Sequence, residues 1–116
     1  MNNTNHQPIK FTLWLEFEQG DTTTWSKEND FCNINVVLED GRQYGLNVWT
    51  YKYFETAIND DKLSGESLHG LYLIPPDLFV KALTRECIQQ VIEDLLKIGD
   101  LEKVLNSSIC GNKQID

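Results

Sequence analysis

The sequence predicts a two-layer α+β domain, in which an antiparallel sheet of about four to five strands has one face covered by two helices. Three observations predict this class. Apolar and polar residues alternate over residues 9–18, a hairpin pattern spans 31–50, and apolar residues repeat at helical spacing over 85–98. A sheet with helices on one side buries each of these apolar faces.

The chain of 116 residues with 41% hydrophobic residues is long enough for one core. We expect a single α+β domain over 9–105, a flexible N-terminus over 1–8 and a flexible C-terminal tail over 106–116. The start, MNNTNHQP, lacks the charged flank and apolar run of a signal peptide, and no apolar stretch reaches about 18 residues. The sequence therefore predicts a cytoplasmic protein that does not enter a membrane.

The first predicted element is a strand over residues 9–18, because the odd positions are apolar and the even positions are polar. Trp14 departs from this pattern. It lies on the polar side of the strand, together with Glu16 and Glu18. The Thr-rich segment that follows predicts a loop, in which Trp25 is the only large apolar residue.

The hairpin over residues 31–50 has a turn signal at Asp40 and Gly41, and side-chain parity selects its loop length. A two-residue loop would mix apolar and polar residues on each face. A three-residue loop over 39–41 places six apolar residues on one face, as the pairs Val36 with Tyr44, Ile34 with Leu46 and Cys32 with Val48. We therefore predict a type I turn followed by Gly41 in the left-handed region, which forms a bulge.

A short helix is predicted after Thr50, whose hydroxyl can cap it, because four apolar residues follow at helical spacing: Tyr51, Phe54, Ala57 and Ile58. Residues 60–70 predict a polar connection. Residues 71–80 contain Pro75 and Pro76, and since proline cannot donate to a sheet, we expect an edge strand, a turn and another short extended piece.

The clearest helix is predicted over residues 85–98, with Thr84 as its cap and Gly99 just past its end. One face carries six apolar residues: Cys87, Ile88, Val91, Ile92, Leu95 and Leu96. Asp100 can cap a last short helical turn that bears Leu101, Val104 and Leu105. The helix after Thr50 and the helix over 85–98 supply the layer that covers the sheet.

Three widely spaced cysteines, Cys32, Cys87 and Cys110, fit neither a disulfide framework nor a zinc ribbon. Cys32 and Cys87 fall on apolar faces and are interpreted as small core residues. Cys110 lies in a polar segment and is interpreted as a spare thiol.

Hairpin parity turns Val37 and Trp49 to the same outward side as Trp14. Burying one tryptophan stabilises a protein by at most roughly 4–6 kcal/mol, which is comparable with the net stability of a small domain. We therefore expect a cover over at least one ring. The candidates are the loop that contains Trp25, a second copy of the chain and another protein.

No motif in the chain indicates catalysis. The sequence has no phosphate loop, dinucleotide-binding turn, nucleophile elbow or zinc-binding helix. Glu16 and Glu18 on one strand face could hold magnesium or supply an acid and a base, but exposed strands also carry such pairs to stay soluble. Asp60 and Asp61, even with His69, are better interpreted as a solvated loop. We expect no catalytic, cofactor or metal site, and we lean toward a protein that is not an enzyme.

The charge balance indicates the kind of partner. With 18 acidic and 10 basic residues the net charge is −8, which disfavours nucleic acid and anionic membranes and favours a basic protein. The leading hypothesis is a non-enzymatic protein-binding module, one form of which is an acidic immunity protein or antitoxin that inhibits a basic nuclease. Its predicted protein-binding residues are Trp14, Glu16, Glu18, Val37, Glu39 and Trp49.

Two alternatives belong to other classes. One is a structural or regulatory homo-oligomer, in its simplest form a homodimer, that buries the face bearing Trp14 and Trp49. The other is a small enzyme or ligand-binding domain that uses Glu16 and Glu18.

Overall fold

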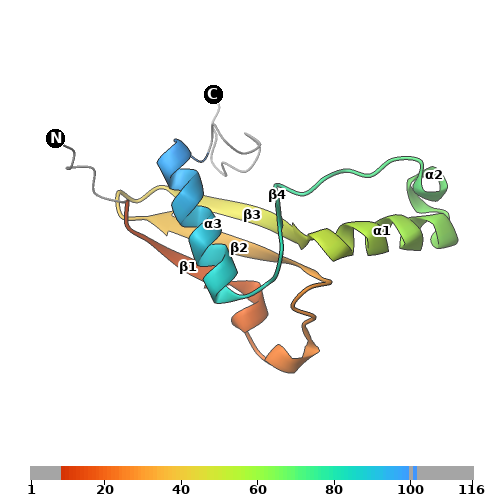
Figure 1. Ribbon diagram of the computed structural model, residues 1–116, viewed down its shortest axis with the longest axis horizontal. Helices are drawn as coiled ribbons and strands as arrows, with labels where there is room; N and C mark the ends of the chain where they lie inside the picture. The colour runs from red at the N-terminus through yellow and green to blue at the C-terminus, as the bar shows by residue number, and fades with distance from the viewer. Residues whose placement is uncertain (1–8, 100, 102–116) are drawn as a thin grey trace.

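The computed structural model describes residues 9–99 and residue 101, which form an α+β fold around a four-stranded sheet (Figure 1). The strands, in their order across the sheet, are β1 (Phe11–Leu15), β2 (Phe31–Leu38), β3 (Gln43–Thr50) and β4 (Leu78–Val80). The helices are α1 (Tyr51–Ser64), α2 (Glu66–Gly70) and α3 (Arg85–Ile98), with two short 3₁₀ turns, η1 (Glu16–Glu18) and η2 (Thr22–Thr24). The predicted α+β class is confirmed. The sheet is mixed, because β4 runs parallel to β3 while the other pairs are antiparallel.

The hairpin of β2 and β3 has the predicted loop and register. Val36 pairs with Tyr44, and the loop closes where the Leu38 N–H donates to the Arg42 carbonyl at 2.8 Å. The Gly41 N–H donates to the Leu38 carbonyl at 2.9 Å, and Gly41 has φ 96°, a conformation that glycine adopts without strain. The three-residue loop and its left-handed glycine are therefore confirmed.

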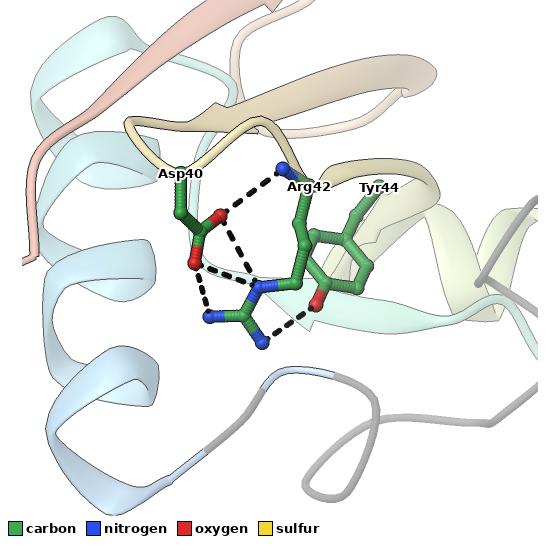
Figure 2. A network of polar contacts seen from close by, with 3 residues as sticks. All are labelled: Asp40, Arg42 and Tyr44. Carbon is green, nitrogen blue, oxygen red and sulfur yellow. Dashed lines mark hydrogen bonds and ion pairs between the residues drawn. The ribbon is translucent and has the colours of Figure 1, made fainter.

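An ion pair stiffens the end of this hairpin (Figure 2). The Arg42 guanidinium lies 3.0 Å from the Asp40 carboxylate, and the same carboxylate accepts the Arg42 backbone N–H at 3.1 Å. These contacts hold the pKa of Asp40 below its ordinary value. Arg42 also donates to the hydroxyl of the buried Tyr44 at 3.5 Å, so the loop is tied to the core residue that follows it.

The core lies between one face of the sheet and α3, which crosses that face (Figure 1). Ile88 and Ile92 of α3 are fully buried. They join apolar residues that alternate along the strands, among them Leu15, Ile34, Val36, Leu46 and Val48. Thr84 caps α3 as predicted, because its hydroxyl accepts the Cys87 N–H at 3.1 Å. We call the sheet and α3 the body, and the sheet face opposite α3 the outer face.

The first strand is shorter than predicted. It ends at Leu15, and Glu16 and Glu18 belong to a 3₁₀ turn, so the prediction of a strand to residue 18 is wrong. Side chains replace the strand pairing at this point. The Glu16 carboxylate accepts the Asn33 N–H at 2.7 Å, and the Gln19 side chain donates to the Leu15 carbonyl at 3.0 Å. Phe17 stays buried in the turn, which is why the apolar alternation continues past the strand.

Helix α1 starts directly after β3, with the predicted cap: the Thr50 hydroxyl accepts the Tyr53 N–H at 3.1 Å. It is longer than predicted, because it continues through the expected polar connection to Ser64. Helix α1 runs outward from the end of β3 (Figure 1), and none of its residues belongs to the core between the sheet and α3. Of the two predicted helices, α3 therefore packs on the core and α1 extends from the sheet.

The chain turns back after α1 through an unusual backbone. Gly65 ends α1 with φ 89°, and Ser67, Leu68 and His69 all have φ between 53° and 61°. A left-handed backbone costs about 1–2 kcal/mol for each non-glycine residue. Residues 71–77 then return to β4 without helix or strand. Because β4 begins only at Leu78, the two extended pieces predicted in 71–80 reduce to one edge strand. We call residues 51–77 the arm.

The predicted flexible ends, Cys110, and the Asp100 cap with Val104 and Leu105 lie outside the described residues. Leu101 of that predicted last turn is described, and it is fully buried in the core.

Candidate protein-binding surfaces

The outer face carries Trp14, as predicted, and its ring is 43% exposed. Strand register places Trp14 beside Asn35, and Asn35 beside Gly45. Gly45 has no side chain, and a Cβ there would lie 3.3 Å from the Asn35 amide oxygen. Trp14 is therefore an exposed ring next to an amide and a glycine, and it has no aromatic contact with any other described residue.

Trp49 also lies on the outer face, but its surroundings are different. Phe31, Trp49 and Phe79 are register partners across three strands. Tyr53 of α1 packs against them, with its ring centroid 4.9 Å from that of Phe31 and 5.0 Å from that of Trp49. The rings of Trp49 and Phe79 are nearly perpendicular, and their centroids are 6.3 Å apart. The first turn of α1 is therefore part of the cover over Trp49, and these contacts fix the base of the arm.

The two tryptophans do not form one patch. Gly45, which lies in the row of Trp14, is four residues from Trp49 along β3, and this corresponds to about 13 Å. Trp25 covers neither ring: it packs against the core on the other face of the sheet. Of the three candidate covers, the Trp25 side chain is therefore excluded for the outward tryptophans.

Glu18 is held by Arg85 at the start of α3. The Arg85 Nε and Nη2 atoms donate to the two carboxylate oxygens at 2.9 and 2.8 Å. The hydrogen bond to Arg85 and its positive charge lower the pKa of Glu18, and the same hydrogen bond together with the negative charge of Glu18 raises the pKa of Arg85. Arg85 thereby neutralises Glu18, whereas Glu16 bonds to Asn33. Their carboxylates thus have separate partners, so this geometry gives no support to a shared metal or acid–base site.

Val37 and Glu39 lie toward the hairpin end of the outer face. Val37 is half-buried between its register partners Thr12 and Gln43, and Thr12 is two positions from Trp14. Glu39 is exposed in the loop, and its backbone N–H donates to the Lys10 carbonyl at 2.9 Å. The structure therefore brings together Trp14 and Val37, with Glu16 and Glu39 at opposite ends of β1, and separates Trp49 and Glu18 from them.

The arm contains exposed apolar residues that the sequence interpretation missed. Five of them lie within residues 63–76 and have exposed fractions from 53% to 88%: Leu63, Leu68, Leu71, Tyr72 and Ile74. A signal was present for four of these residues. Leu63 does not share the helical spacing of Phe54, Ala57 and Ile58, and the run LYLI is followed by two prolines that end any sheet pairing.

Within residues 9–99 and 101, no three His, Cys, Asp or Glu side chains lie close enough to hold a metal ion. Cys32 is a buried core residue, as predicted, and its pKa is raised to about 12 by burial, with smaller contributions from the negative charges of Glu16 and Asp30. Cys87 is half-buried and packs against the core. The Cys32 thiol is therefore protonated at neutral pH.

Comparisons with protein-family models, curated proteins and solved structures found no match to this chain. In the part of the chain that the structure describes, each helix is too short or too polar to cross a membrane.

Proposed function

We propose that the protein is a non-enzymatic binding module that recognises a basic protein through the outer face around Trp14. The observation that carries this proposal is the 43% exposure of Trp14 on a sheet face whose other side completes the core. The ring is not required to complete that core. Exposed aromatic residues surrounded by polar groups are typical anchors of protein interfaces.

The charge of the chain supports a basic partner. The net charge is −8, and Glu16 and Glu39 lie at the two ends of β1, which bears Trp14. Carboxylates around an aromatic anchor act mainly on the rate of encounter with a positively charged surface. One concrete form of this function is an immunity protein or antitoxin that inhibits a basic nuclease in the cytoplasm. The free thiols of Cys32 and Cys87 are compatible with that compartment.

The test is affinity capture from a native cell extract, followed by binding measurements with the purified captured protein. Wild type, Trp14→Ser and Ile98→Ser are compared. Ile98 is the matched control, because it is exposed and lies at the end of α3, which covers the opposite face of the sheet. We expect Trp14→Ser to weaken binding by 30-fold or more, as loss of an interface hot spot does, and Ile98→Ser to change it less than twofold.

Salt dependence tests the electrostatic part separately. The association rate of wild type should fall steeply between about 50 and 300 mM salt, because surface charges are then screened. Equal binding by wild type and Trp14→Ser would refute the proposed surface. An association rate that does not change with salt would refute the basic partner.

A further inference from the structure

The far end of the arm, residues 63–76, carries the four most exposed large apolar residues of the described chain. We call this segment the arm tip. Leu63, Leu71 and Ile74 are each more than three-quarters exposed, and Leu68 and Tyr72 are more than half exposed. Figure 1 places α2 at the opposite end of the molecule from β1 and α3, so the body does not cover it. Monomeric proteins seldom leave so many large apolar residues together in water.

The arm tip differs from the remainder of the chain in charge. Glu66 is its only Asp, Glu, Lys or Arg, although the whole chain has a net charge of −8. A basic protein would therefore find little to attract it here. Two copies of the chain that meet at residues 63–76 would, by contrast, each bring only one acidic side chain of this segment, Glu66, into the contact.

The arm also keeps the acidic bodies apart. Helix α1 has 14 residues, which at about 1.5 Å per residue carries the tip roughly 21 Å beyond β3. Two copies in contact at their tips would hold their bodies about 40 Å apart. The Debye length at physiological ionic strength is about 8 Å, so repulsion between the bodies would be largely screened.

Only part of the tip backbone is hydrogen-bonded within the described chain. The left-handed turn is closed by hydrogen bonds from Leu71 N–H to the Ser67 carbonyl at 2.9 Å and from His69 N–H to the Gly65 carbonyl at 3.3 Å. The backbone N–H groups of Tyr72, Leu73 and Ile74 donate to no other described residue. A partner strand could therefore pair with residues 72–74 without breaking an existing bond.

We propose that the arm tip is a homodimer interface, in which Leu68, Leu71 and Ile74 pack against the same residues of a second copy around a two-fold axis. Five largely exposed apolar side chains offer on the order of 400 Å² of apolar surface per copy. A standard interface buries about 800 Å² per partner, somewhat more than half of it apolar. The tip therefore supplies an interface at the small end of this range.

Sedimentation equilibrium of the full chain between about 5 and 500 μM tests this proposal. The average mass should rise from 13.4 kDa toward twice that value. The double variant Leu68→Ser/Leu71→Ser should raise the dissociation constant at least tenfold, whereas Ile98→Ser and Trp14→Ser should leave it unchanged within twofold. Circular dichroism of each variant establishes that it is folded.

Two further measurements do not depend on weakening the interface. Raising NaCl from about 50 to 500 mM should leave the dimer unchanged or tighten it, because the two copies have charge of the same sign. In a chain with Cys110→Ser, mild oxidation of Leu71→Cys should form an interchain disulfide much faster than oxidation of Ile98→Cys.

The outcomes separate this inference from the proposed function. A monomer at 500 μM, a dimer that persists in the tip variant, or a dimer lost in Trp14→Ser would each overturn it. Loss of the basic partner in Trp14→Ser concerns the outer face alone, so either proposal can fail while the other stands.

Discussion

The body and the arm place their apolar residues in opposite environments. Ile34 and Leu46 in the sheet and Ile88 and Ile92 in α3 are almost completely buried, whereas the arm tip leaves five large apolar side chains mostly in solvent. Burial of apolar surface is the main favourable term in folding, so the stability of the fold is concentrated in the body. The five exposed apolar residues of the arm tip therefore do little to stabilise this chain and are available for contact with another molecule.

The largest expected effect is the contrast between a core and an arm residue of similar size. Ile92→Ala leaves a cavity between α3 and the sheet and should lower the free energy of unfolding by about 2–5 kcal/mol. Leu63→Ala in α1 should change it by less than about 0.5 kcal/mol. Denaturant unfolding followed by circular dichroism measures both, and similar losses for the two variants would break the comparison.

The junction between body and arm should show an intermediate effect. The buried Thr50 hydroxyl accepts the Tyr53 N–H at 3.1 Å and the Asp30 N–H at 3.2 Å. Thr50→Ala leaves both groups without this partner and should cost about 1–2 kcal/mol of unfolding free energy. Thr50→Ser keeps the hydroxyl and should cost less than half as much. If both substitutions cost the same, the hydroxyl is not what joins the two regions.

The smallest effect is expected from the ion pair between Glu18 and Arg85 in the body. Arg85 lowers the pKa of Glu18 in the folded state, so the pair stabilises the fold above the unfolded value of about 4.5. This stabilisation disappears as the pH falls through the lowered folded pKa. Both side chains are more than a third exposed, so the contribution is at most about 1 kcal/mol.

The measurement is a double-mutant cycle with Glu18→Gln and Arg85→Gln, followed by thermal unfolding at several pH values. The coupling free energy should be positive near pH 7 and fall toward zero as the pH drops through the lowered pKa of Glu18. A coupling that does not change with pH would show that the carboxylate charge is not responsible.

The sequence was sufficient to predict the hairpin because its signals agree. A shift of one residue would turn Ile34 and Leu46 into solvent, and Gly41 is the residue that tolerates the required left-handed turn. The caps of α1 and α3 were equally predictable, because Thr50 and Thr84 stand directly before helical patterns. Trp14 was correctly placed on the outer face by the same side-chain parity.

Other features depend on contacts between distant residues. The strand pattern of β1 continues to Glu18, but Asn33 and Arg85 provide partners that allow the turn. The run LYLI was interpreted as an edge strand, because an apolar run alone does not specify whether it is buried. The parallel pairing of β4 rests on three residues, too few to produce a pattern in the sequence. The candidate surface on the arm was missed for these reasons.

The two ends of the arm enter the sheet close together. The chain leaves β3 at Thr50 and returns at Asp77, whose N–H donates to the Asn47 carbonyl at 3.0 Å and whose carboxylate accepts the Asn47 N–H at 2.8 Å. Asn47 and Thr50 are three positions apart, or about 10 Å. The arm is therefore joined to the sheet at two points that lie close together on β3. Its length and sequence can diverge, or be replaced with a different recognition loop, while the sheet keeps its register.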